Sequence, residues 1–305
     1  MIRKMLRAYT EALREQDESK KHARDFAERL NDVRARCYGA TVADCSHQPI
    51  FLMASSWRSG STLLQRMMMA GCDQLLMWGE PFDRSNIFES LRNQLRPFTR
   101  EWPPDKYFFD HTRSSLHEEW IANLYPDVEC LRKAHINFLL TLFCEPAKAV
   151  GRQRWGVKEV RLGVDDAAYL KWLFPEAKFV FLCRNPLAAY ASYRRFGKWY
   201  SYWPDSKVVT PTQFGRHWRT LTADFMARHR DVDGVFIKYE DLRSSSAVAE
   251  INAYLGFDLV LADELRRLDG KSDAPRPTAA DLPFVEKALL KAALGHSADM
   301  AGYRL

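Results

Sequence analysis

Residues 51–64, FLMASSWRSGSTLL, place an apolar run directly before a turn of small residues and a helix that starts near Thr62. The backbone N–H groups of such a turn and of the first helical turn converge on one point, which makes an anion site. Glycine permits close backbone approach, hydroxyls donate hydrogen bonds and arginine adds a fixed positive charge. The candidate phosphate- or sulfate-binding residues are Arg58, Ser59, Gly60, Ser61 and Thr62.

This turn differs from the loop of nucleotide triphosphatases, which reads G-x-x-x-x-G-K-[ST], because the lysine is missing and only one glycine is present. The difference disfavours a P-loop-type nucleotide kinase, the main rival enzyme. A second interpretation is a serine-rich turn that only caps the helix.

Residues 178–195, KFVFLCRNPLAAYASYRR, repeat the plan of strand, turn and helix. Arg184 stands at the strand end, Asn185 is expected to cap the helix, and Pro186 suits its first position. Ser192 lies about two helical turns further, so it reaches the same ligand only if the strand end curls over the helix. Two anion sites in one sheet indicate a ligand with phosphate at both ends, unless Arg184 forms a surface ion pair.

The elements that position these turns fit a parallel sheet. Short apolar runs bounded by charged or turn residues are the candidate strands Ile50–Ala54, Gln74–Trp78, Trp155–Lys158, Lys178–Cys183 and Val235–Tyr239. Helical segments between them supply the crossovers that parallel strands need. We expect an α/β fold, a P-loop-like doubly wound sheet of about five parallel strands flanked by helices, with ligands at the carboxyl ends of the strands.

Residues 1–36 predict a helix whose apolar positions recur at four-three spacing, either packed on its own domain or used for homo-oligomer formation. The expected division is an N-terminal helical extension, residues 1–47, and a catalytic domain, residues 48–305. Residues 96–125 and 196–204 are aromatic insertions that either line an acceptor pocket or anchor long loops.

Composition narrows the class of protein. Hydrophobic residues make up 47% of the chain and charged residues 28%, as in a globular domain. No apolar run is long enough for a membrane span or a signal peptide, which favours the cytoplasm. The six cysteines are scattered, so neither a disulfide framework nor a metal site is expected. The charge of +6 is spread along the chain, which favours a polyanionic small cofactor over nucleic acid.

Together, WRSGSTLL and KFVFLCRNPLAAYAS resemble the two nucleotide-binding signatures of sulfotransferases that use 3′-phosphoadenosine-5′-phosphosulfate (PAPS). The resemblance covers about residues 50–305 and implies that the first loop binds the 5′-phosphosulfate and the second the 3′-phosphate. RSGST followed by GEP is most similar to the branch with protein-tyrosine sulfotransferases and bacterial sugar sulfotransferases. The product nucleotide implied is adenosine 3′,5′-bisphosphate, and the acceptor is a hydroxyl of a sugar, a peptide tyrosine or a small-molecule alcohol.

The resemblance also assigns roles to single residues. It implies that Glu80 of WGEPF is the general base, that Lys158 of VKEVR stabilises the transferring sulfuryl group with Arg58, and that Tyr239 of FIKYEDL contacts the nucleotide. Further cofactor-binding residues implied are Arg184 and Ser192.

Alternatives remain for both catalytic candidates. Glu80 has a second interpretation as a turn cap before Pro81, and Lys158 as an ion-pair partner of Glu159. His111 and His117 are rival bases. A non-catalytic nucleotide-binding protein remains the non-enzymatic alternative.

Two departures from the family pattern stand out. A further arginine for the 3′-phosphate is expected where this chain has Phe196, and we expect Arg195, rather than Arg194, to replace it. The late serine and lysine that close over the nucleotide have no secure counterpart; the candidates are Lys271, Ser272 and Thr278.

Overall fold

The computed structural model describes residues 26, 28–35, 47–81, 86–109, 121–196, 208–261, 263 and 278–305. Its centre is a sheet of five parallel strands in the order β2-β3-β1-β4-β5. The strands are β1 (Ile50–Ala54), β2 (Leu75–Trp78), β3 (Arg154–Glu159), β4 (Lys178–Cys183) and β5 (Val235–Lys238). Every predicted strand is present, with ends that differ from the prediction by one residue at most. The predicted class, a parallel α/β sheet, is confirmed.

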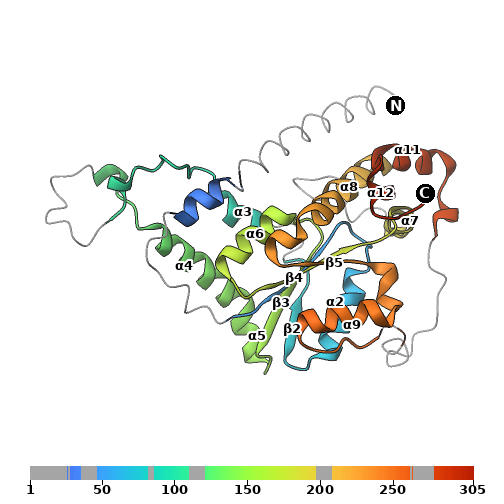
Figure 1. The fold of residues 1–305 in the computed structure, drawn as a ribbon, viewed down its shortest axis with the longest axis horizontal. Coiled ribbons are helices and arrows are strands. Elements are labelled where there is room, and N and C mark those ends of the chain that lie inside the picture. The colour runs from blue at the N-terminus through green and yellow to red at the C-terminus, as the bar shows by residue number, and fades with distance from the viewer. Residues whose placement is uncertain are drawn as a thin grey trace.

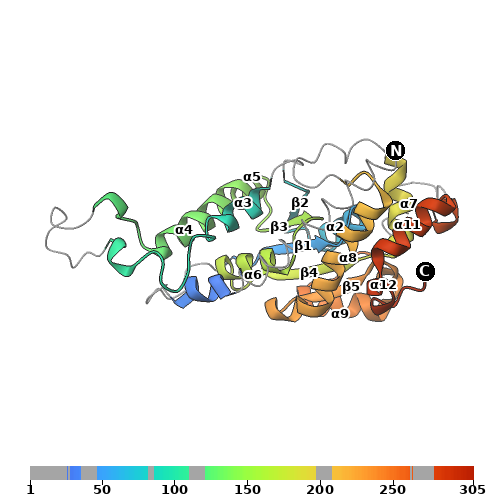
Figure 2. The same cartoon turned by 90° about the horizontal axis from the view of Figure 1, so that it is seen from above.

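Helices cover both faces of the sheet (Figures 1 and 2). The described helices are α2 (Ser61–Gly71), α3 (Ile87–Asn93), α4 (Val128–Leu139), α5 (Glu145–Ala149), α6 (Val164–Leu173), α7 (Pro186–Phe196), α8 (Pro211–Arg228), α9 (Ser245–Leu255), α11 (Phe284–Leu294) and α12 (Ser297–Met300). A π-helical turn, Leu140–Cys144, joins α4 to α5. Single 3-10 turns occur at Asp105–Tyr107, Ile121–Asn123, His229–Val232, Tyr239–Arg243 and Ala279–Asp281.

The central strand β1 is buried on both faces, as an interior parallel strand must be. Its side chains alternate between two apolar clusters. Ile50 and Leu52 belong to the cluster that includes residues of α2 and α9, whereas Phe51 and Met53 belong to the one that includes residues of α4 and α6. The sheet is therefore the middle layer between two cores.

The strand order places the topological switch point of the sheet between β1 and β4, which are paired neighbours. From β1 the chain continues through α2 to β2 at one edge of the sheet, and from β4 it continues through α7 and α8 to β5 at the other edge. Because the two connections leave in opposite directions, their loops separate at the carboxyl ends of the strands. Ligands of such sheets bind at this switch point.

Part of the predicted N-terminal helix lies within the described residues. Residues 28–35 are helical, and Phe26, Leu30 and Val33 are buried in the cluster with Phe51. The remainder of residues 1–36 lies outside the described residues, so the division at residue 47 and self-association stay predictions. His111, His117, Lys271, Ser272 and residues 197–203 also lie outside them. None of the described helices has the length and apolarity that crossing a bilayer requires.

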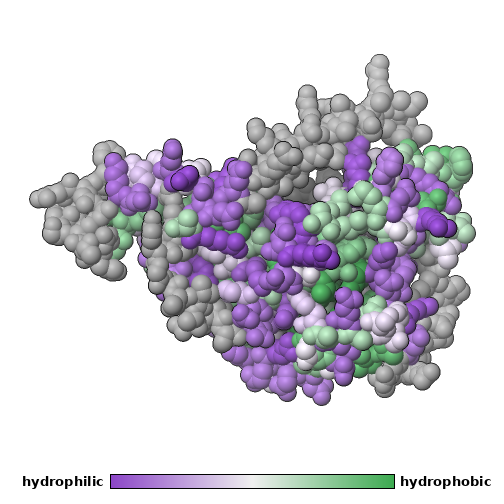
Figure 3. Space-filling model, viewed as in Figure 1, coloured by the Kyte–Doolittle hydropathy of each residue, from purple (hydrophilic) through white to green (hydrophobic). Residues whose placement is uncertain are grey.

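Hydrophilic side chains cover much of the face in Figure 3, and apolar side chains reach the surface near α11. Phe284, at the start of α11, is 85% exposed, whereas Phe51 in β1 is 1% exposed. Substituting each phenylalanine in turn therefore compares the contribution of a buried ring to stability with that of an exposed ring.

Phe51→Ala removes a ring that stacks on Phe179 and makes edge contacts with Phe88 and Trp155. We expect the free energy of unfolding in urea to fall by about 3–5 kcal/mol, because a cavity replaces a fully buried ring. Phe284→Ala is the control and is expected to change it by less than about 0.5 kcal/mol. Equal effects of the two substitutions would contradict the assignment of the core.

Candidate active site

The first predicted anion site is the turn between β1 and α2. Arg58 and Gly60 have left-handed backbone conformations, with φ of 63° and 93°. A Cβ at Gly60 would lie 2.1 Å from Cδ2 of Tyr239, so the position accepts only glycine. Helix α2 starts at Ser61 and has neither a side-chain cap nor an acidic residue in its first turn. Its N-terminal partial positive charge is therefore available to an anion.

The hydroxyl groups of this turn test whether an anionic ligand fits it. Ser55, Ser56 and Ser59 are fully buried, and their Oγ atoms have no hydrogen-bond partner among the residues that the structure describes. A buried polar group left without a partner costs about 1–3 kcal/mol, so three of them in one turn indicate a missing acceptor. The oxygens of a phosphate or sulfate group supply such acceptors.

The second predicted anion site is the turn between β4 and α7. Asn185 Oδ1 accepts hydrogen bonds from the N–H groups of Leu187, at 3.0 Å, and Ala188, at 3.1 Å, which confirms the predicted helix cap. Helix α7 begins at Pro186, as expected for a first helical residue with no N–H group to satisfy.

The two turns are joined by direct hydrogen bonds. Arg58 Nε donates to Ser192 Oγ at 3.0 Å, and Arg184 Nη1 donates to the carbonyl oxygen of Arg58 at 2.8 Å. Ser192 thus meets the first turn although it lies well along α7, because β1 and β4 are neighbours and the turn after β1 reaches the side of the helix. Arg58, Arg184 and Ser192 form one cationic site.

Tyr239 closes this site from the end of β5. The Arg184 guanidinium carbon lies 4.6 Å from the centre of the Tyr239 ring, and the same ring packs on Gly60. Burial lowers the pKa of Arg184. Arg184 forms no ion pair with any described residue, so the surface ion pair that was its second interpretation is absent from the described part of the chain.

Glu80 and Lys158 meet at the neighbouring strand ends. Trp78 of β2 pairs with Val157 of β3, so Glu80, just beyond β2, lies near Lys158, among the last residues of β3. Lys158 Nζ donates to Glu80 Oε1 at 2.5 Å. The side chain of Lys158 is 8% exposed and that of Glu80 is 20% exposed. The arrangement brings a carboxylate and an ammonium group together at a partly shielded point.

Glu159 is not the partner of Lys158, although the two are adjacent in sequence. Successive strand residues point to opposite faces, so Lys158 points to the same face as Leu52 and Glu159 to the same face as Met53. Glu159 binds Arg161 instead, with Arg161 Nε at 2.7 Å from Glu159 Oε1. The Lys158–Glu159 pair that was an alternative is therefore wrong.

The other predicted binding residues lie at or near the rim. Thr62 is exposed in the first turn of α2, and Arg195 is exposed at the end of α7 without an ion pair to any residue that the structure describes. Arg194 binds Glu286 of α11 at 2.8 Å. Thr278 caps the 3-10 turn at Ala279–Asp281. Across the described ranges, no three His, Cys, Asp or Glu side chains are grouped as a metal site requires.

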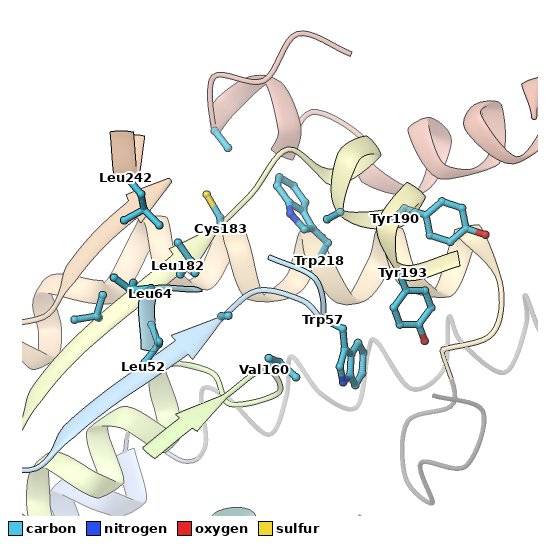
Figure 4. Close-up of a cluster of buried hydrophobic side chains, with 14 of the residues drawn as sticks. Leu52, Trp57, Leu64, Val160, Leu182, Cys183, Tyr190, Tyr193, Trp218 and Leu242 are labelled. Carbon is cyan, nitrogen blue, oxygen red and sulfur yellow. The ribbon is translucent and has the colours of Figure 1, made fainter. Parts of the chain in front are cut away.

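Two residues of the site were missed from the sequence. The Trp57 ring stacks on His217 of α8, with ring centres 4.8 Å apart, and His217 Nε2 bonds the carbonyl oxygen of Val160 at 3.0 Å. Figure 4 shows Trp57 beside Val160, at the ends of strands β1 and β3. His217 therefore links Trp57 of the first turn to Val160, the residue that follows β3. A lone histidine on an amphipathic helix gives no spacing signal for this role.

One family model matches more than half of the chain. A family model described as "Sulfotransferase family" matches residues 49–259. No curated protein matches the chain significantly.

Similar solved structures include three sulfotransferases. The sulfotransferase domain from the curacin biosynthetic pathway is 16% identical, with a TM-score of 0.48, and the match covers 85% of this chain and 99% of that one. The sulfotransferase domain of the Synechococcus PCC 7002 olefin synthase is 21% identical, with a TM-score of 0.46 and coverage of 88% and 99%. A mouse sulfotransferase complexed with PAP is 14% identical, with a TM-score of 0.39 and coverage of 90% and 82%.

Burial lowers the pKa of His217 from 6.5 to about 4. Below pH 6.5 the unfolded chain binds a proton there that the folded chain does not, so stability falls as the pH drops from 6.5 toward 4. We expect the unfolding free energy to fall between pH 7 and pH 5 by about 2 kcal/mol more in the native chain than in His217→Gln. Identical pH dependence in urea titrations of the two proteins would contradict this.

Proposed function

Because this chain belongs to the sulfotransferase family, we propose that it transfers a sulfuryl group from PAPS to a hydroxyl acceptor. The observation that carries the proposal is the contact of Lys158 Nζ with Glu80 Oε1, 2.5 Å, at the same edge of the sheet as the two joined turns. A base and a positioned cation are what such a transfer requires from a protein.

The two joined turns would hold the donor by its two charged ends. Arg58 and the turn Ser59–Thr62 would bind the 5′-phosphosulfate, with the buried serine hydroxyls as further donors. Arg184 and Ser192 would bind the 3′-phosphate, and Tyr239 would contact the nucleotide. Arg195 would add a cation at the rim, where its side chain is exposed.

When bound, the donor supplies the sulfuryl group, which passes to the acceptor oxygen while adenosine 3′,5′-bisphosphate leaves. Glu80 takes up the proton of the acceptor hydroxyl at its carboxylate oxygen. Its hydrogen bond with Lys158 holds this carboxylate in place at the end of β3. Lys158 and Arg58 provide positive charge where negative charge develops on the leaving oxygen. The chemistry that we propose uses no metal ion.

The acceptor remains a class of hydroxyl compound: a sugar, a tyrosine side chain or a small alcohol. Membership of the branch with protein-tyrosine and bacterial sugar sulfotransferases, and a cytoplasmic location, are part of the proposal. The loop of residues 96–109 carries Trp102 and Phe109 at 45% and 38% exposure. Such side chains suit contact with the apolar face of an acceptor.

Glu80→Gln removes the base but keeps the size of the side chain. We expect turnover of labelled PAPS to fall by about 10²–10⁴-fold, because a positioned base contributes about that much. Affinity for adenosine 3′,5′-bisphosphate, followed by thermal shift, is expected to stay close to that of the native chain. Glu145→Gln, on the exposed surface of α5, is the control and is expected to keep native turnover.

Lys158→Ala tests the partner of Glu80 in the same assay. We expect slower turnover with nucleotide affinity retained, because the lysine acts on the leaving oxygen rather than on the bisphosphate. Near-native turnover in both Glu80→Gln and Lys158→Ala would remove the pair from the chemistry.

A further inference from the structure

A buried ion pair lies one residue beyond Lys158, on the opposite face of β3. Arg161 binds Glu159 through two hydrogen bonds, Nε to Oε1 at 2.7 Å and Nη2 to Oε2. The Glu159 and Arg161 side chains are 5% and 11% exposed. Glu159 Oε1 also accepts the N–H of Val160 at 2.8 Å. The planar guanidinium is thus held in one orientation.

The remaining arm of this guanidinium reaches the start of α3. Arg161 Nη1 donates to Asn86 Oδ1 at 3.4 Å, and the carbonyl oxygen of Asn86 accepts the N–H of Ser90 at 2.7 Å in the first turn of that helix. Glu80 lies in the connection from β2 to α3. One end of this connection is fixed by the pairing of Trp78 with Val157, and the other by Arg161.

We propose that Arg161, oriented by Glu159, is a positioning residue that holds the start of α3 and thereby keeps Glu80 against Lys158. The proposal rests on the proposed function of Glu80 and Lys158. Three observations support it. Arg161 makes two hydrogen bonds to Glu159 and one to Asn86, and Glu80 lies between β2 and Asn86 in the sequence. The hydrogen bonds of Glu159 run to Val160 and Arg161, and the charge of Glu80 acts on it only through space.

Burying the Glu159–Arg161 pair removes two charges from water, which costs desolvation free energy. Burial raises the pKa of Glu159, and the guanidinium of Arg161 opposes that rise. Replacing buried pairs by apolar residues is often neutral or stabilising, so stability alone does not account for the pair. The orientation of the guanidinium accounts for the pair. Its two hydrogen bonds to Glu159 direct Nη1 toward Asn86, which an apolar pair cannot do.

The test uses variants that leave no charge unpaired. Arg161→Lys keeps a cation beside Glu159 but loses the fork, Asn86→Ala removes only the far acceptor side chain, and Asn86→Asp retains an acceptor. Arg132→Lys is the matched control, because the Arg132 side chain is also largely buried but binds Glu129 and the carbonyl oxygens of Trp172 and Leu173 at the C-terminal end of α6. Each protein is assayed for kcat, for affinity for adenosine 3′,5′-bisphosphate, and for hydrogen exchange of peptides covering residues 79–93.

We expect kcat to fall by about 10- to 100-fold in Arg161→Lys and Asn86→Ala, since a misplacement of about 1 Å costs up to that much. Nucleotide affinity should stay native, exchange should quicken only in residues 79–93, and Asn86→Asp should restore turnover. Native kcat and exchange in Arg161→Lys and Asn86→Ala, or an equal loss of kcat in Arg132→Lys, overturns the proposal. If the native chain transfers no sulfuryl group, the proposed function fails, and the exchange of residues 79–93 alone decides whether Arg161 holds this segment.

Discussion

The hydrogen bond from Arg58 Nε to Ser192 Oγ joins two turns that are 134 residues apart in sequence, and the candidate site depends on that junction. It forms because β1 and β4 are paired in the centre of the sheet, which brings the loops at their carboxyl ends together. Arg184 reinforces the junction by donating to the backbone of Arg58 and by stacking on Tyr239. The sheet thereby brings the two candidate anion-binding turns together, with Arg58 and Arg184 in direct contact.

Side chains along β3 alternate between the two faces of the sheet, which gives Lys158 and Glu159 different partners. Lys158 points toward the face shared with Leu52 and meets Glu80, whereas Glu159 points the other way and binds Arg161. Lys158 and Glu159 therefore do not pair with each other, although they are consecutive in the strand. Val160, the next residue, accepts the hydrogen bond of His217, which stacks on Trp57 of the first turn, and Arg161 reaches Asn86 before α3.

The strands could be predicted from the sequence because each is a short apolar run bounded by charged residues, a local signal that the buried parallel sheet enforces. The turns at Gly60 and Asn185 could also be predicted, since glycine and a helix cap have local physical requirements. The pairing of Lys158 with Glu80 instead of Glu159 could not, because it depends on strand register and on residues far apart in sequence. The stacking of Trp57 on His217 could not be predicted for the same reason, because it depends on how α8 packs over the sheet.

The central claim is that the two joined turns bind both ends of one doubly phosphorylated nucleotide. Calorimetry of the full chain with adenosine 3′,5′-bisphosphate and with adenosine 5′-monophosphate tests it most directly. The account predicts measurable binding of the bisphosphate and at least about tenfold weaker binding of the monophosphate, because charge-assisted hydrogen bonds to the 3′-phosphate are worth about 1.5–3 kcal/mol. Equal affinity for the two nucleotides, or no heat with the bisphosphate, would contradict it.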